Sequence, residues 1–300
     1  MTVAVLYGGP SEERVISLDS GEAVAAALAR RGHEVACIDA GSDLPERLRA
    51  CRAERAWVAL HGPFGEDGVV QGVLETLGIP YTGSGVLGSA LAMDKLRSKQ
   101  VWQAAQIPTP PVVDLANEPY DTVAARLGWP VMVKPAASGS SLGMSRVERA
   151  ADLVQAHKEA RFYDDTVLAE AWVDGTEVTV GVVDGEPLPV LRLQTARGFY
   201  DYTAKYESGA GTEYLHPTGL GEMVETYCQR IALAAFKALA CEGWGRVDLM
   251  VSEAGVQVIE VNTIPGMTEH SLVPKAAAHA GTGFDDLVER ILATAATAQG

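Results

Sequence analysis

The sequence predicts an α/β protein of two or three domains that opens with a small doubly wound parallel sheet. Three hundred residues exceed what one ordinary hydrophobic core organises, so more than one domain is expected. Up to about residue 94, short apolar strands alternate with helical stretches, which is typical of a parallel sheet covered by helices. Near the C-terminus, two apolar runs flank Ser252-Glu253-Ala254-Gly255 and predict a β-hairpin.

The N-terminal part follows this alternation from its first residues. An apolar strand at 2–7 runs into the turn Gly8-Gly9-Pro10, and an alanine-rich helix follows at about 15–30. Further elements are predicted as strands at 34–39 and 56–60 and helices at 44–51 and 69–77. Because the chain opens directly into a strand, we expect no signal peptide.

Two further units are expected after this part. The second begins at about residue 95 and contains strands at 130–134 and 167–173. The third begins with a hairpin that turns at Asp184-Gly185, and continues with a polar loop at 195–212, a helix at 222–240, the C-terminal hairpin and two helices. The 222–240 helix has an apolar stripe formed by Met223, Tyr227, Ile231, Ala234 and Ala238. Linkers at 108–111 and 217–221 fit boundaries between units or elements.

Composition excludes several classes of protein. The formal net charge of −15 argues against general binding to nucleic acid or to anionic membranes, which needs a basic surface. The four cysteines lack metal or redox spacing, so reduced thiols are expected at Cys37, Cys51, Cys228 and Cys241. No apolar run reaches the roughly 18 residues that a membrane-spanning helix needs. We therefore expect a cytoplasmic protein.

The C-terminal hairpin carries the most informative polar residues. If its loop centres on Ala254, Asp248 lies opposite Glu260 and Arg246 lies opposite Asn262. Opposed residues share a face of the sheet, so all four polar groups point the same way. The other face then carries an apolar layer of Val247, Leu249, Ile259 and Val261. A shift of one residue in the register would separate the two carboxylates.

Two carboxylates and an amide, with no His or Cys among them, predict a hard-oxygen site suited to Mg²⁺ with phosphates. The neighbouring Arg246 suits charge that develops on a transferred phosphoryl or acyl group. The alternative is an exposed strand pair with an ordinary salt bridge. The segment Asn262-Thr263-Ile264-Pro265-Gly266 is unusual for a strand end and favours the functional site.

Two familiar phosphate motifs are poor matches to this chain. Gly83-Ser84-Gly85-Val86-Leu87-Gly88 has the letters of the dinucleotide fingerprint, but no proper strand precedes it and no acidic residue follows about twenty positions later. It predicts the glycine-rich start of a helix instead. The nucleotide P-loop requires a Gly-Lys pair, and the chain contains none.

A better phosphate site begins at Lys134, at the end of a buried strand. The small-residue loop 136–143 follows and would bring main-chain N–H groups close to anionic oxygens. The strand at 167–173 carries Glu170, and Glu177 lies four positions beyond it. A carboxylate there would accept hydrogen bonds from ribose hydroxyls or an adenine amino group. The alternative is a solvated loop beside a surface-reaching lysine.

In combination, the strand lysine, the Gly/Ser loop, the second strand and the Asp…Glu-x-Asn hairpin resemble the ATP-grasp fold. More narrowly, nearly the whole chain resembles the D-alanine–D-alanine ligase family. Matching stretches lie at 8–14, 61–62, 65–68, 80–85, 93–95, 201–206, 243–248, 260–267 and 270–272. The resemblance implies an N-terminal α/β domain at 1–94 and two α+β domains, 95–173 and 174–300, that hold ATP between them. The 195–212 loop would be a lid over the cleft.

The implied reaction is ATP-dependent ligation of two D-alanine molecules through a D-alanyl phosphate, for peptidoglycan precursors. Implied ligands are ATP, D-alanine and two Mg²⁺ or Mn²⁺ ions, and the implied assembly is a homodimer. One alternative is another ATP-grasp carboxylate–amine ligase with different amino-acid specificity, which would alter Glu13, His61 and Ser271. A second alternative is a non-catalytic amino-acid or nucleotide binding protein, which needs no metal-binding carboxylate pair.

The resemblance also implies which residues bind ATP and the metal ions. Phosphate oxygens would be neutralised by Lys95, Lys134 and Lys205. Further contacts to ATP would come from Ser141, Glu170, Ala171, Trp172, Val173, Glu177 and Asn262. The metal ligands would be Asp248, Glu260 and Asn262. The family often has a lysine where this chain has Ala171, and a more charged stretch in place of 136–138, so contacts to adenine and to the loop are less defined.

For D-alanine, Glu13 would anchor the first ammonium group and His61 would contact the first carboxylate. Arg246 and the Gly266 N–H would stabilise the tetrahedral intermediate, while Ser271 and Leu272 would bind the second carboxylate. The implied catalytic residues are Glu13, Ser140, Tyr206, Arg246 and Ser271.

Within this set, Glu13, Ser140 and Tyr206 would form a hydrogen-bonded trio. The tyrosine at 206 implies a dipeptide product, since the resembling position is Phe in ligases that make the ester-linked depsipeptide. Taken alone, His61 fits a buried structural histidine, Glu13 fits a carboxylate at a helix start, and Tyr206 fits a packing residue.

Overall fold

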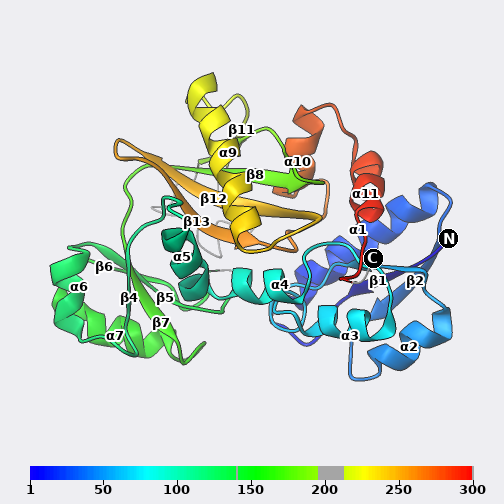
Figure 1. The fold of residues 1–300 in the computed structure, drawn as a ribbon, viewed down its shortest axis with the longest axis horizontal. Coiled ribbons are helices and arrows are strands. Elements are labelled where there is room, and N and C mark those ends of the chain that lie inside the picture. Colours follow the sequence, from blue (N-terminus) through cyan, green and yellow to red (C-terminus); the bar gives the residue numbers. More distant parts are fainter. Residues whose placement is uncertain (140, 195–212, 299–300) are drawn as a thin grey trace.

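The computed structural model describes residues 1–139, 141–194 and 213–298, and its described strands form three sheets. A three-stranded sheet from the N-terminal part lies at one end of the molecule and a four-stranded sheet at the other, with the largest sheet between them (Figure 1). This confirms the predicted fold class, α/β and in part α+β, with a parallel sheet in the N-terminal part.

The first sheet has the order β2-β1-β3, with β1 (Thr2–Tyr7) paired in parallel to β2 (Glu34–Asp39) and β3 (Arg55–Val58). Its helices are α1 (Arg14–Arg30), α2 (Leu44–Cys51) and α3 (Val69–Leu77). The four central residues of β1 are buried, as expected for a parallel strand covered on both faces. The predicted alternation of strands and helices is confirmed.

The second sheet is antiparallel, with the order β4-β7-β5-β6. Its strands are β4 (Val112–Asp114), β5 (Val131–Pro135), β6 (Ser145–Val147) and β7 (Val167–Ala171), packed against α6 (Tyr120–Arg126) and α7 (Ala150–Ala160). Helices α4 (Val86–Met93) and α5 (Lys95–Ala104) lead into it. Gly85 is the N-cap residue of α4, so the Gly83–Gly88 segment is the start of a helix, as predicted.

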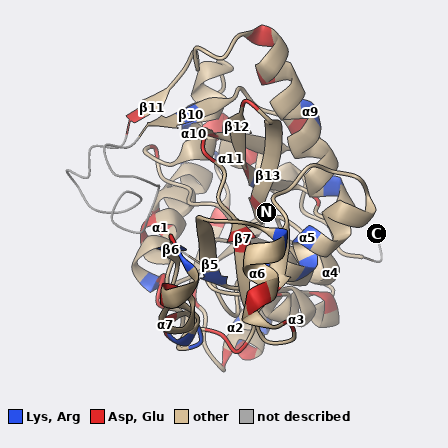
Figure 2. Cartoon of the chain, turned by 90° about the vertical axis from the view of Figure 1, so that its left-hand side faces the viewer, with Lys and Arg blue, Asp and Glu red and all other residues tan. Residues whose placement is uncertain are grey.

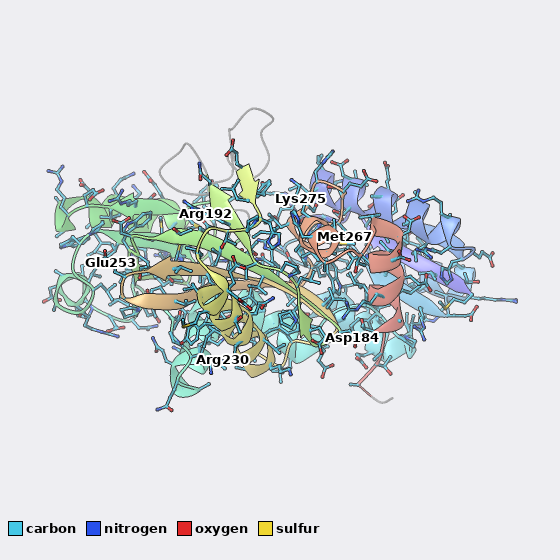
Figure 3. All side chains as sticks on the ribbon, turned by 90° about the horizontal axis from the view of Figure 1, so that it is seen from above. Asp184, Arg192, Arg230, Glu253, Met267 and Lys275 are labelled. Atoms are coloured by element: carbon cyan, nitrogen blue, oxygen red, sulfur yellow. The ribbon has the colours of Figure 1, made fainter. Side chains whose placement is uncertain are left out.

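The third sheet has the order β11-β10-β8-β12-β13, with β9 paired to β8. Its strands are β8 (Thr176–Val183), β9 (Glu186–Pro187), β10 (Leu191–Gln194), β11 (Glu213–Leu215), β12 (Trp244–Ser252) and β13 (Gly255–Asn262). Asp184 and Gly185 have φ of 55° and 73°, the positive values that the predicted two-residue turn requires. The turns at Asp184 and Glu253 lie at opposite ends of this sheet (Figure 3).

One face of the third sheet is covered by α9 (Glu222–Ala238). The buried residues of α9 are Cys228, Ala232, Ala235 and Phe236. The predicted stripe is therefore partly wrong: Met223 is 86% exposed and Ala234 is also exposed, because the buried face is rotated by about one residue. Tyr227, Ile231 and Ala238 pack against the core from its edge.

The C-terminal hairpin has the predicted residue pairs, but its loop is shorter than expected and a β-bulge restores the register. Asp248 lies opposite Glu260 and Arg246 lies opposite Asn262, as predicted. The loop is only Glu253-Ala254, because Ser252 pairs with Gly255, and this turn alone would place Glu260 opposite Val247. A β-bulge between the Asp248 and Leu249 pairings absorbs the extra residue, Ile259. The prediction that Ile259 belongs to the core layer is wrong: Val258 fills that position.

The two C-terminal helices, α10 (Leu272–His279) and α11 (Phe284–Ala293), share one hydrophobic core with the first sheet. Helix α11 lies beside α1 (Figure 1). Arg30 on α1 donates two hydrogen bonds to Asp285 on α11, at 2.8 and 2.6 Å. The end of the chain is thus packed back on its beginning. None of the described helices is long and apolar enough to cross a membrane.

Candidate active site

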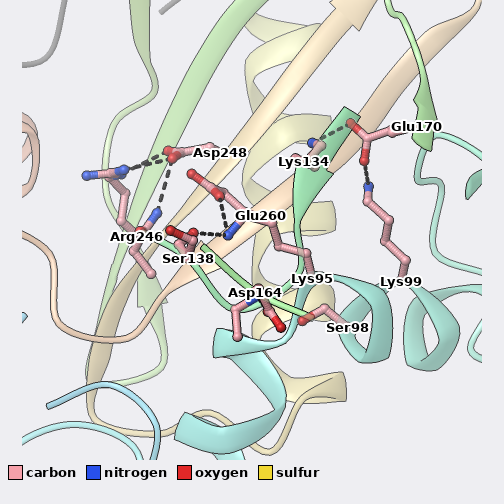
Figure 4. A network of polar contacts seen from close by, with 12 residues as sticks. Lys95, Ser98, Lys99, Lys134, Ser138, Asp164, Glu170, Arg246, Asp248 and Glu260 are labelled. Atoms are coloured by element: carbon pink, nitrogen blue, oxygen red, sulfur yellow. Dashed lines mark hydrogen bonds and ion pairs between the residues drawn. The ribbon is translucent and has the colours of Figure 1, made fainter. Parts of the chain in front are cut away.

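The face of the third sheet opposite α9 carries a network of polar groups centred on Asp248 (Figure 4). Arg246 donates two hydrogen bonds to the carboxylate of Asp248, Nε to Oδ1 at 2.8 Å and Nη2 to Oδ2 at 2.7 Å. Thr179 on β8 donates to Oδ1 at 2.6 Å, and the Asn262 amide donates to Oδ2 at 3.1 Å. The predicted polar face of the hairpin therefore exists and extends across to β8.

Glu260 connects this face to the start of α5. Its Oε2 lies 3.7 Å from Nζ of Lys95, and the same Nζ donates to the main-chain oxygen of Ser138 at 2.8 Å. Ser138 belongs to the small-residue loop after β5. Lys95 therefore joins the carboxylate face of the third sheet to the loop proposed to bind phosphate.

The oxygen groups of this face fit a hard divalent cation. Within the described residues, no group of three or more His, Cys, Asp or Glu side chains gathers as a metal site. Asp248, Glu260 and the amide of Asn262 would therefore supply part of a coordination shell, and phosphate and water oxygens would complete it, which is usual for Mg²⁺. The orientation of the Asn262 amide is assigned from its hydrogen bond, and a half-turn would present its oxygen instead.

Behind this face lies a buried cluster of two lysines and one glutamate. Lys134 at the end of β5 donates to Oε1 of Glu170 at 2.7 Å, and Lys99 on α5 forms an ion pair with Oε2 (Figure 4). All three side chains are almost completely buried. Burial raises the pKa of Glu170, but the two lysines together outweigh burial and hold this pKa below its usual value. Glu170 is therefore ionised.

Lys99 has no counterpart among the predicted site residues. On the sequence it is one more lysine in a polar helix, and nothing in its spacing marks it as buried. Its burial follows from the packing of α5 between the second and third sheets, because Trp102, one turn further on, inserts into the core of the third unit. A lysine at 0% exposure could not be found from periodicity.

The predicted base-binding segment, at the end of β7 and just after it, borders a wide cavity. This cavity has a volume of about 730 Å³, and its wall includes Ala171, Trp172 and Val173 together with the hairpin loop of the third sheet. The Trp172 N–H donates to the Pro130 oxygen at 3.2 Å, so a base edge would have to use other main-chain groups of this segment. The Arg146 guanidinium stacks on the Trp172 ring at 4.5 Å.

Glu177 is placed on the same face of the third sheet as the polar network. It precedes Thr179 by two residues on β8, and Thr179 contacts Asp248 from that face. The valines between and beyond them, Val178 and Val180, point into the α9 core. Glu177 thus shares the polar face with Asp248, and its contact with the ribose stays a prediction.

A second cavity of about 410 Å³ lies between the first and third units. Its wall includes the residues predicted to bind D-alanine: Glu13, His61, Arg246, Gly266, Ser271 and Leu272. They lie just before α1, after β3, on β12, and along the segment that leads from β13 into α10. The structure therefore gathers all six of them, far apart in sequence, around one cavity of a size that suits small molecules.

His61 and Glu66 give this cavity unusual electrostatics. Burial lowers the pKa of His61 to about 4, so the imidazole is neutral at pH 7. Burial, and then the nearby carboxylate of Glu13, raises the pKa of Glu66 to about 8. Glu66 accepts hydrogen bonds from the N–H groups of Gly62 at 2.8 Å and Ile264 at 3.3 Å. Glu66 lies in the stretch 65–68 that resembles the family, but the sequence alone predicted no role for it.

The floor of the cavity is the segment that leads into α10. Ser271 is the N-cap residue of α10, and its Oγ accepts a hydrogen bond from the Thr268 N–H at 3.0 Å. A Cβ atom on Gly266 would come within 3.1 Å of the same Oγ, so a glycine is favoured there. Ser271 and Leu272, the first residue of α10, thus both line the cavity.

The small-residue loop lies against the first unit. A Cβ atom on Gly139 would come within 2.6 Å of Oε2 of Glu13, so the loop passes directly over this carboxylate. The loop base is held by Asp164, which accepts a hydrogen bond from the Ala137 N–H at 2.7 Å. Ser141 has a φ of 60°. The predicted roles of Ser140, Lys205 and Tyr206 lie outside the described residues.

The fold and this site define the ATP-grasp class of ligases. Two units of antiparallel strands face each other, one contributing lysines and a small-residue loop and the other an acid–amide face. A family model described as D-ala D-ala ligase C-terminus matches residues 101–293, and one described as D-ala D-ala ligase N-terminus matches residues 42–84. The chain belongs to the D-alanine–D-alanine ligase family.

Individual relatives support the same family over the full length. The D-alanine–D-alanine ligase of Pseudomonas entomophila is 52% identical over 301 residues, which covers 99% of this chain and 94% of that protein. That of Halorhodospira halophila is 52% identical over 294 residues, covering 98% and 95%.

Solved structures give the same result. The D-alanine–D-alanine ligase of Bacillus anthracis has a TM-score of 0.88 at 36% identity, covering 98% of this chain and 97% of that one. The structure of that ligase complexed with ATP has a TM-score of 0.86 at 33% identity, with the same coverage. The predicted fold class is confirmed.

Proposed function

We propose that this protein joins two D-alanine molecules in an ATP-dependent reaction that passes through D-alanyl phosphate. One observation carries the proposal: the amino-acid cavity and the carboxylate face share a wall. Glu66, Gly139 and Asn262 line the 410 Å³ cavity and also the small cavity beside Lys95 and Glu260. An amino acid in the first cavity would therefore lie next to a phosphate held at the second.

The chemistry follows from what a carboxylate lacks as an electrophile. Its oxide is a poor leaving group, so one carboxylate oxygen first attacks the γ-phosphorus of ATP and ADP leaves. The amine of the second D-alanine then attacks the carbonyl carbon, loses a proton and expels phosphate, which forms the peptide bond. A divalent ion on Asp248, Glu260 and Asn262 supplies charge neutralisation for the phosphoryl oxygens when bound.

Residues of this chain would bind and orient both amino acids. Glu13 holds the first ammonium group and neutral His61 contacts the first carboxylate. Arg246 and the Gly266 N–H stabilise the oxyanion of the tetrahedral intermediate. Ser271 and the N–H of Leu272 receive the second carboxylate at the start of α10. Each of these groups lines the same cavity.

Phosphate and nucleotide contacts are proposed for the cleft. Lys95 and Lys134 would lie closest to the phosphates, with Ser141 at the loop. Ala171, Trp172 and Val173 would surround the base and Glu177 the ribose, while Glu170 would meet the adenine amino group. Lys205, Tyr206 and Ser140 would join from the 195–212 lid and the loop, and the closed cleft would keep water from the acyl phosphate.

The wider setting is part of the proposal. We infer two Mg²⁺ or Mn²⁺ ions at the acid–amide face, a cytoplasmic homodimer that binds neither nucleic acid nor membranes, and a product used for peptidoglycan. The division of the chain at residues 94 and 173 is proposed on the same basis.

A phosphate-release assay tests the function. We expect release from ATP to require Mg²⁺ and D-alanine, and to be weak with L-alanine, D-serine or D-lactate; chromatography should identify the dipeptide as product. Omission of each component is the control. Strong turnover with another amino acid and little with D-alanine would instead support a carboxylate–amine ligase of different specificity.

A further inference from the structure

The buried lysine Lys99 is not accounted for by the proposed reaction. It lies on α5 with 0% exposure, contacts Oε2 of Glu170, and donates from Nζ to Oγ1 of Thr109 at 2.9 Å. Thr109 in turn donates to the main-chain oxygen of Val258 at 2.8 Å. Lys99 reaches Glu170 from α5, whereas Lys134 precedes the small-residue loop, so an influence of Lys99 on ATP would act through its neighbours (Figure 4).

The charges of the cluster show what that influence is. One carboxylate, Glu170, is shared by two ammonium groups, so the three side chains together carry a charge of about +1. With Lys134 and Glu170 alone the net charge of the pair would be zero, because Glu170 would neutralise the charge of Lys134. Lys134 is the member next to the small-residue loop, whereas Lys99 approaches Glu170 from α5 (Figure 4).

We propose that Lys99 is a positioning residue for ATP: it offsets and fixes the carboxylate of Glu170 from behind, and so leaves the charge of Lys134 available to the phosphate oxygens. This inference rests on the proposed function, because it assumes that the cleft binds ATP. It assigns Lys99 no contact with the nucleotide or with the reacting atoms. In a chain of net charge −15, a buried cation next to the cleft helps to keep the electrostatic potential there positive.

A purely structural role makes different predictions. An ion pair that only fastens α5 to β7 would change stability, and would affect ATP and D-alanine kinetics alike. The electrostatic role affects ATP selectively and depends on pH. Burial lowers the pKa of Lys99 to about 8; Glu170 and Glu260 oppose this, and Lys134 adds to it. The ammonium group therefore loses its charge at mildly alkaline pH.

The test substitutes Lys99→Met, which keeps the length of the side chain without its charge. We expect KM for ATP to rise about tenfold, the size expected for one charge acting over several ångströms at the effective dielectric of a protein. The kcat and the KM for D-alanine should stay within about threefold. In the wild type, KM for ATP should rise above about pH 8, and in the variant this rise should be absent.

Three further variants make the result decisive. Lys237→Met removes an exposed lysine on α9 and should leave all constants unchanged. Thr109→Val removes the other partner of Lys99 and should raise KM for ATP in the same direction, by less. In a Glu170→Gln background, Lys99→Met should have little further effect, because no carboxylate remains to be offset.

A folded Lys99→Met protein with unchanged KM for ATP would overturn the inference. The same holds if Lys99→Met raises KM for ATP as much in the Glu170→Gln background as in the wild type. If Lys99→Met fails to fold, the pH rise and its change in Thr109→Val decide the question. Calorimetry with a non-hydrolysable ATP analogue separates failure of this inference from failure of the proposed function. If the affinity for the analogue depends on Lys99 but no dipeptide forms, the ligase function is rejected and the role of Lys99 is kept.

Discussion

Asp248 illustrates how single residues organise this site. Its two carboxylate oxygens accept four hydrogen bonds, two from Arg246 and one each from Thr179 and Asn262. A carboxylate with this many hydrogen bonds is fixed in direction, which suits the metal-binding role proposed for it. Removal of any one partner would loosen the others, so we regard these four residues as one unit.

Glu66 and His61 have opposite shifts in pKa, and this sets the pH dependence of stability. Burial with Glu13 raises the pKa of Glu66 from 4.5 to about 8, and burial lowers that of His61 from 6.5 to about 4. Between pH 4.5 and 6.5 the folded state keeps a proton on Glu66 and lacks one on His61, so the two effects cancel. Between pH 6.5 and 8 only Glu66 differs, and the folded state binds one proton more.

Stability should therefore fall as pH rises from about 6.5 to 8, by at most about 2 kcal/mol. We expect the substitution Glu66→Gln to remove most of this fall, since glutamine carries no proton to lose. Urea unfolding at several pH values measures the free energy directly. The exposed Glu46→Gln serves as control and should keep the wild-type slope. An unchanged slope in Glu66→Gln would mean that Glu66 is ionised in the folded protein at neutral pH.

The individual residues also show where sequence reasoning stops. Glu13, His61, Arg246 and Ser271 were found because they lie in motifs, and the structure places them around one cavity. Lys99 carries no signal of its own. Its burial depends on how three units pack together, and no local pattern in the sequence reports such packing.

At the scale of elements, the C-terminal hairpin is the most instructive case. The loop assumed from the sequence differs from the real two-residue turn, yet the predicted pairs are correct because the bulge at Ile259 restores them. Bulges depend on the whole sheet and are not visible in a pattern of alternating residues. The buried face of α9 was predicted wrongly for a related reason. Small apolar residues, mostly alanines, lie around much of this helix, so its packing on the sheet decides which face is buried.

The bulge is what directs Glu260 to the cleft, and a substitution there tests the hairpin. We expect Glu260→Gln to lower turnover by roughly two orders of magnitude or more, because an amide offers a metal ion no negative charge. The thermal midpoint should change little, since this carboxylate is partly exposed. Glu186→Gln, an exposed carboxylate on β9 of the same sheet, is the matched control. Near-normal turnover of Glu260→Gln would show that this face does not hold the metal.

At the scale of the whole molecule, acidic residues outnumber basic ones by fifteen (39 against 24). Both kinds are spread over the helices of the molecule, with basic positions on α5 and β5 (Figure 2). The composition argued against a nucleic-acid binder, but it could not locate the cations. Their gathering at Lys95, Lys99 and Lys134 results from the packing of α5 against β4 and β7, beside the end of β5.

The arrangement of units also explains why one cavity serves residues from both ends of the chain. Helices α10 and α11 share a hydrophobic core with the first sheet, so Ser271 and Glu13 line the same cavity. The sequence predicted the units and their order. It could not predict that the C-terminal helices pack on the N-terminal unit, because no spacing between residues records that contact.

The central claim is that an oxygen of D-alanine attacks ATP before the peptide bond forms, and isotope transfer tests it most directly. The protein would be incubated with ATP, Mg²⁺ and D-alanine labelled with ¹⁸O in its carboxylate, and the released phosphate analysed by mass spectrometry. The account predicts one ¹⁸O atom in each phosphate, released together with one dipeptide. Phosphate without ¹⁸O, whose fourth oxygen then came from water, or phosphate that appears without dipeptide, would contradict it.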